Sequence, residues 1–166
     1  MMMRFFAALT ALLALAPAAE ASPCSPWLGE CSYYRCLSAQ QSCGEREMIP
    51  RVALTYCERY HDNEAAFTPH GRRFLNDVRR CLQEKIEAAA PATCARSSEV
   101  FQDVHFDCYL ETGYCDLSWG DRGRIAWIGR RMLVGTDFFW TGRRIEAACH
   151  DSRRRSSSDW NSLGLR

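Results

Sequence analysis

Residues 67–91 read FTPHGRRFLNDVRRCLQEKIEAAAP, and this stretch decides the fold class. Thr68-Pro69 is typical of a helix start, because a hydroxyl cap is followed by proline at the first helical position. The apolar side chains that follow recur at the spacing of one helix face; they are Phe74, Leu75, Val78, Cys81, Leu82 and Ile86. Three alanines extend the pattern and Pro91 ends it. The stretch therefore predicts one long amphipathic helix with an inward-facing cysteine.

The same spacing recurs on both sides of this helix. Residues 49–60 carry it upstream, and a downstream helix is expected to begin at Ser97 or Ser98 and to end at Gly113. Two further apolar patterns lie at residues 125–133 and 145–149, the second continuing the first or forming a helix of its own. No stretch alternates apolar and polar residues as a strand would. The sequence therefore predicts an all-α protein of four or five helices.

The first 21 residues have the features of a signal peptide. Met1–Arg4 is short and positive, residues 5–16 are an apolar run, and Ala19-Glu20-Ala21 fits a small-x-small cleavage site. The chain from Ser22 onward contains no apolar run of eighteen residues, so no membrane span is expected. The mature protein is therefore expected to be secreted or periplasmic.

Ten cysteines, all between Cys24 and Cys149, dominate the composition. No C-x-x-C pair occurs, which disfavours zinc, and an exported chain with an even number of cysteines favours five disulfides. Four of the ten fall within residues 22–48, which we interpret as a cysteine knot-like segment or as short helices. The expected organisation is a disulfide-rich domain over residues 22–150, followed by a basic, flexible tail over residues 151–166.

The cysteine intervals, 7, 5, 7, 14, 24, 13, 14, 7 and 34, resemble those of the stanniocalcins, a family of secreted regulatory proteins. Three local motifs support the resemblance: Phe67-x3-Gly71-x2-Phe74 ahead of Cys81, Cys31-x4-Cys36, and Cys108-Tyr109-x5-Cys115. Arginine supplies all the basic residues except Lys85, a bias typical of a GC-rich genome, which suits a bacterial member of the family.

The resemblance implies a disulfide pairing and a function. The implied pairs are Cys24–Cys36, Cys31–Cys57, Cys43–Cys94, Cys81–Cys108 and Cys115–Cys149. The implied function is that of a non-enzymatic, hormone-like or inhibitory ligand that binds an extracellular or periplasmic protein; the family acts in calcium and phosphate homeostasis and in metalloproteinase inhibition. The family's eleventh, intersubunit cysteine is missing here, so a covalent dimer is not expected, whereas a non-covalent homodimer remains open.

The sequence offers little for catalysis. The G-x-S-x-G and H-E-x-x-H motifs are absent, and the four histidines, His61, His70, His105 and His150, are expected to be exposed residues at helix ends. We therefore expect no enzyme activity, no metal and no cofactor. One alternative is a small exported hydrolase that uses His61 or His70 as a base beside a carboxylate.

Charge is unevenly distributed along the mature chain. Residues 22–121 carry a net charge of −5 and residues 122–166 a net charge of +6. The C-terminal part is expected to pack on an acidic body; the alternative is a polyanion-binding or envelope-binding module. Nucleic acid is not an expected partner, because no aromatic-basic binding module is present.

The best candidate for a partner-binding surface is the aromatic run Phe138-Phe139-Trp140 with the nearby Arg143 and Arg144. Three consecutive rings on a helix cannot all face one core, so at least one is expected to be exposed, and tryptophan and arginine are favoured interface residues. The alternative buries two rings and lays the third on a disulfide. Trp119 and Trp127 are expected in the core, over the disulfide of Cys115.

Overall fold

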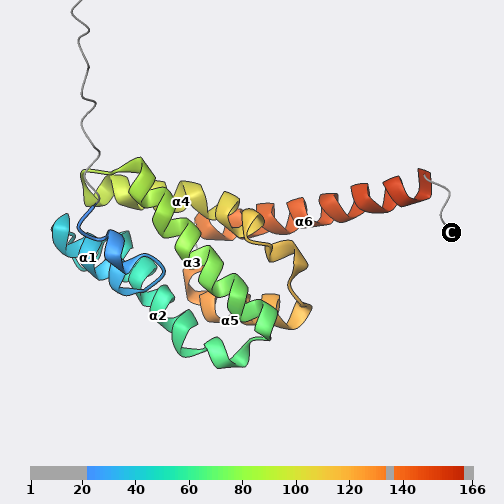
Figure 1. Cartoon of the computed structure of the whole chain (residues 1–166), viewed down its shortest axis with the longest axis horizontal. Coiled ribbons are helices and arrows are strands. Elements are labelled where there is room, and N and C mark those ends of the chain that lie inside the picture. The colour runs from blue at the N-terminus through green and yellow to red at the C-terminus, as the bar shows by residue number, and fades with distance from the viewer. Residues whose placement is uncertain (1–21, 134–136, 163–166) are drawn as a thin grey trace, which may run out of the picture.

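A computed structural model describes residues 22–133 and 137–162, and these residues are almost entirely helical (Figure 1). Within them the six α-helices are α1 (Ser32–Gln40), α2 (Thr55–Asp62), α3 (Pro69–Ala89), α4 (Cys94–Glu111), α5 (Trp119–Leu133) and α6 (Asp137–Ser162). Four short helical segments join them: η1 (Ser25–Trp27), η2 (Ile49–Leu54), η3 (Glu64–Ala66) and η4 (Tyr114–Asp116). The described residues form no strand, which confirms the all-α prediction; the additional helix is α1.

Helix α3 begins and ends where its sequence predicts. The Thr68 hydroxyl accepts a hydrogen bond from the Gly71 amide at 3.0 Å, Pro69 opens the helix, and Ala90 closes it with a left-handed backbone (φ +43°). The predicted start of α4 was wrong, since Thr93 and not a serine is the cap. Ser97 lies one turn inside α4, fully buried, and donates a hydrogen bond to the Gln41 side chain at 2.7 Å.

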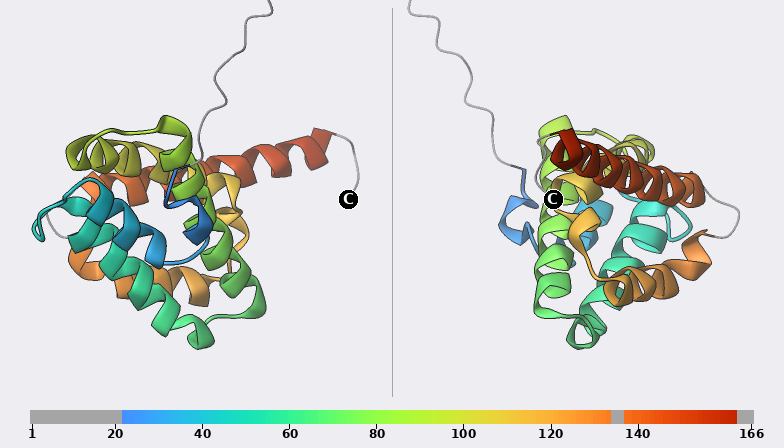
Figure 2. Two further views of the ribbon diagram at one scale, coloured as in Figure 1. Left: turned by 60° about the vertical axis from the view of Figure 1, so that its left-hand side comes forward. Right: turned by 90° about the vertical axis from the view of Figure 1, so that its right-hand side faces the viewer.

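The helices pack around one core. Helix α3 packs on α4 as a hairpin, α4 and α5 both pack on α6, and α2 packs on α5 (Figures 1 and 2). Aromatic rings form the centre, where Tyr34 meets Phe101 with ring centroids 5.9 Å apart and Phe74 meets Tyr109 at 5.5 Å. Edge-to-face contacts of this kind add to the free energy gained from burying the rings.

Five disulfides connect these elements, and all ten cysteines take part. The pairs are Cys24–Cys36, Cys31–Cys57, Cys43–Cys94, Cys81–Cys108 and Cys115–Cys149, which is the pairing that the stanniocalcin resemblance implies. Only the first closes within residues 22–48, so this segment consists of short helical elements tied outward to α2 and α4 and is not a self-contained knot. Cross-links of this kind fit an oxidising compartment.

The C-terminal segment differs from its prediction. Helix α6 continues through Ser162, so residues 151–162 extend a helix where a flexible tail was expected, and α6 projects beyond the other helices (Figures 1 and 2). The sequence allows this because no glycine or proline interrupts residues 143–162. The expected signal peptide, residues 1–21, lies outside the described residues. Among the described helices, none is long and apolar enough to cross a membrane.

Candidate partner-binding face and neighbouring cavity

The aromatic run at the start of α6 is divided between core and surface. Phe138 is only 6% exposed and packs against His105 and Phe101, with ring centroids 5.1 and 6.2 Å away. Phe139 and Trp140 are 43% and 63% exposed. Two rings therefore face outward, but Phe138 belongs to the core and is not accessible to a partner, contrary to its place in the predicted surface.

Two arginines follow these rings on α6 and lie against aromatic faces. The guanidinium of Arg143 is 6.0 Å from the Phe139 ring centroid and 5.9 Å from that of Trp140, whereas Arg144 is 4.5 Å from the ring of Phe106. Within the described part of the chain, neither arginine has a carboxylate partner. Phe139, Trp140 and Arg143 thus form one exposed group, here named the α6 face.

The opposite side of α6 is fixed to the body at several points. Ile145 and Cys149 are buried, and Cys149 forms the disulfide with Cys115. The Glu146 carboxylate accepts hydrogen bonds from the Tyr114 hydroxyl at 2.7 Å and from Arg122 at 3.1 Å. Burial and this carboxylate raise the pKa of Tyr114, so the phenol stays protonated and donates. These contacts hold the α6 face in one position.

A largely apolar cavity of about 520 Å³ lies beside the α6 face. Helices α5 and α6 line most of it, and α2, α4 and η4 contribute further side chains. Phe139 and Arg143 line both the cavity and the face, whereas Trp140 does not line the cavity. The cavity and the face are therefore adjacent sites that share Phe139 and Arg143, and Trp140 belongs to the face alone.

His105, on α4, borders this cavity and is 7% exposed. Its Nδ1 lies 2.8 Å from the Phe101 carbonyl oxygen, and because a carbonyl can only accept, Nδ1 carries the proton and Nε2 is the acceptor. Burial lowers the pKa of His105 to about 4, so the ring is neutral near pH 7. The prediction of an exposed histidine was therefore wrong for His105. Its position, four residues after Phe101 and three before Cys108, places it on the buried stripe of α4, and this spacing could have indicated burial.

His61 lines a separate, polar groove of about 660 Å³ together with Glu58 and Asp62. Carboxylates beside this histidine are what the hydrolase alternative requires. However, His61 Nδ1 lies 3.6 Å from Glu64, Glu58 pairs with Arg35, and no described hydroxyl donates to this imidazole. His70 is exposed and does not line the groove. Among the described residues, the groove therefore holds no hydroxyl that His61 activates.

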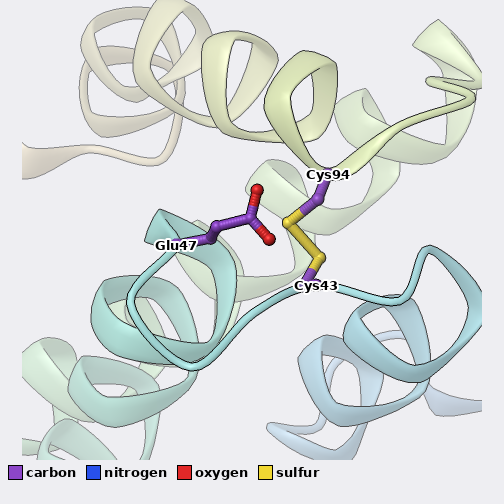
Figure 3. Close-up of side chains that lie close together, drawn as sticks. All are labelled: Cys43, Glu47 and Cys94. Carbon is purple, nitrogen blue, oxygen red and sulfur yellow. A yellow bond between two sulfur atoms is a disulfide. The ribbon is translucent and has the colours of Figure 1, made fainter.

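Two groups of side chains have the spacing of a metal site, but both contain disulfides. Cys43, Glu47 and Cys94 lie together in Figure 3, and Cys81 and Cys108 lie near Glu111. Thiolates bind metals, and these four sulfurs are bonded to one another in pairs. Glu47 instead accepts a hydrogen bond from the Gly44 amide at 2.5 Å. Neither group therefore supports a metal site.

Trp119 and Trp127 lie on the surface, 73% and 66% exposed, so their predicted place in the core was wrong. Arg122 lies 5.2 Å from the Trp119 ring and Arg130 lies 3.8 Å from the Trp127 ring. Cation–π contacts of this kind stabilise an exposed indole. Both indoles therefore lie beside a guanidinium on α5 instead of over the disulfide of Cys115.

Comparison of the chain with protein-family models, curated proteins and solved structures finds no match. The stanniocalcin resemblance therefore stays a prediction that rests on cysteine spacing and short motifs.

Proposed function

We propose that this protein is an exported, non-enzymatic regulatory ligand that binds a protein partner through the α6 face. The observation that carries the proposal is the exposure of Trp140, 63%, beside Phe139 and Arg143 on a helix fixed by the Cys115–Cys149 disulfide. Tryptophan and arginine are the side chains most enriched among residues that dominate binding energies. A surface already fixed before binding loses less conformational entropy when the partner docks.

The stanniocalcin resemblance indicates which class of partner to expect. An agreement of all five disulfides with the pairing that the resemblance implies supports a hormone-like or inhibitory ligand of a secreted or periplasmic protein. The calcium- and phosphate-regulating and metalloproteinase-inhibiting roles of that family are the first activities to test.

The experiment begins with a photoreactive amino acid at position 140 of the oxidised protein. Proteins from the exported fraction of the source cells are cross-linked to it and identified, and the candidate partner is then purified. Its Kd is measured with the unmodified protein, with Trp140→Ala and with the control Trp27→Ala, which removes an exposed indole (45%) from η1. We expect Trp140→Ala to weaken binding by about 30-fold, equivalent to a loss of about 2 kcal/mol, and Trp27→Ala to change it less than about twofold.

The salt dependence of the same interaction separates protein binding from the polyanion alternative. A protein interface built on aromatic rings should keep most of its affinity in high salt, whereas binding to a sulfated glycan or anionic lipid should fall steeply. Equal affinity of the Trp140→Ala variant and the unmodified protein would contradict the assignment of the α6 face.

A further inference from the structure

The cavity between α5 and α6 has the size and lining of a small-molecule site. Its volume of about 520 Å³ falls within the range of roughly 300–1,000 Å³ typical of ligand pockets. Much of its wall is apolar; the side chains that line it include Ile125, Ala126, Met132, Phe138, Ile145 and Ala147. Atoms that line an empty cavity lack dispersion contacts on the cavity side, and an apolar ligand supplies these contacts.

Two charged residues line this cavity, and they differ in their partners. The Glu146 carboxylate is occupied by the Tyr114 hydroxyl at 2.7 Å and by Arg122 at 3.1 Å. Arg143, in contrast, contacts aromatic rings and has no carboxylate partner among the described residues. The guanidinium of Arg143 is exposed and can therefore pair with an anion.

The other polar groups of the cavity add no competing charge. The Tyr60 hydroxyl donates to the Ile125 carbonyl at 3.0 Å, and His105 is neutral near pH 7 because burial lowers its pKa to about 4. A cationic ligand would face Arg143, and the carboxylate of Glu146 is already paired with Arg122. An anion with an apolar chain can pack against the apolar wall and pair with the arginine.

We infer that this cavity binds a small amphipathic carboxylate of the fatty-acid type, with its chain between α5 and α6 and its carboxylate at Arg143. The guanidinium fork matches a carboxylate in geometry and can hold both oxygens. The inference does not rest on the protein-binding proposal, because Trp140 is outside the cavity lining.

Gly142 is a position from which a larger side chain can enter the cavity. This glycine is helical and lines the cavity, and a Cβ built on it meets no atom within 4 Å. Gly142→Leu therefore occupies ligand space while raising helix propensity. The matched control is Gly123→Leu, since Gly123 is an exposed helical glycine of α5 that also has no neighbour within 4 Å and does not line the cavity.

Titration calorimetry with dodecanoate and the oxidised protein tests the inference. We expect saturable binding with a Kd in the micromolar range, weakened at least about 30-fold by Gly142→Leu and less than about twofold by Gly123→Leu. Ala147→Leu, a second cavity-filling variant, should weaken binding in the same direction if Gly142→Leu does not fold. Circular dichroism checks the fold of each variant.

The carboxylate assignment is tested with dodecanol, which has the same chain without the charge. The unmodified protein should bind dodecanoate about tenfold more tightly than dodecanol, and Arg143→Ala should abolish this preference. No dodecanoate binding at about 1 mM, or undiminished binding by a folded cavity-filled variant, would overturn the site. Equal binding of the two ligands by the unmodified protein would overturn the assignment of Arg143. Trp27→Ala, which removes an exposed indole from η1 outside the cavity lining, should bind dodecanoate normally.

Discussion

Protonation of His105 should make the protein acid-labile in a defined pH range. The ring is enclosed by Phe101, Phe138 and Tyr109, with centroids 4.5, 5.1 and 5.6 Å away, so the fold accommodates the neutral form. Burial lowers its pKa from 6.5 to about 4, partly opposed by the hydrogen bond to the Phe101 carbonyl. Between these two values the unfolded chain binds a proton and the native chain does not, so acid favours unfolding.

The magnitude follows from the size of this pKa change. One pKa unit corresponds to about 1.4 kcal/mol, so the free energy of unfolding should fall by about 3 kcal/mol as the pH falls from 6.5 to about 4. Above pH 6.5 the protein keeps this part of its free energy of unfolding in full, and below pH 4 it has lost this part.

Urea unfolding followed by circular dichroism, with the disulfides intact, measures the effect between pH 7.5 and 4. His105→Phe keeps an aromatic ring in the site and cannot take up a proton, so its loss of stability over this range should be smaller than that of the unmodified protein by about 3 kcal/mol. His70→Gln, at an exposed position, is the control and should retain the full pH dependence. If the free energy of unfolding changes equally with pH in His105→Phe and in the unmodified protein, the reasoning is refuted.

Two further predictions concern the supports of the fold. Gly71→Ala should destabilise the protein by roughly 1–3 kcal/mol, because the new Cβ would lie 2.8 Å from Cγ of the buried Asp121, whereas Gly123→Ala, where a Cβ meets no atom, should be neutral or slightly stabilising in thermal unfolding. Replacing both Cys115 and Cys149 by serine should lower the free energy of unfolding by roughly 3–4 kcal/mol, since the bond closes a loop of 34 residues. Guanidinium unfolding without reductant measures this loss, and an unchanged midpoint would contradict the cross-linking role.

The sequence was sufficient for α3 because the signals of this helix are local. The cap at Thr68, the apolar stripe that follows and the stop at Pro91 are all read from neighbours a few residues apart, and the structure has them where expected. The start of α4 was misplaced because both Thr93 and the serines after it are good caps, and the choice depends on a distant contact. Ser97 turns inward to the Gln41 side chain, which a local rule cannot foresee.

The candidate site was predictable only in part, for the same reason. Consecutive rings at 138–140 require some exposure, but which ring is buried depends on where α4 presents Phe101 and His105. The cavity depends on the spacing between α5 and α6 and leaves no pattern in either helix alone. Its one sequence clue is the small residue at position 142, which only the assembled structure shows to face open space.

Helix α6 shows how the buried contacts and the cross-links divide their roles. Phe138, Ile145 and Cys149 are buried at intervals of seven and four residues, which fixes the rotation of the helix about its axis. The disulfide from Cys149 to Cys115 additionally fixes its position along that axis, since a covalent bond permits no sliding. With both rotation and translation fixed, Trp140 is displayed on the surface and Gly142 faces the cavity before any ligand arrives. The proposed protein partner and the proposed carboxylate would therefore each bind a site that is already ordered in the folded protein. Binding then costs less conformational entropy.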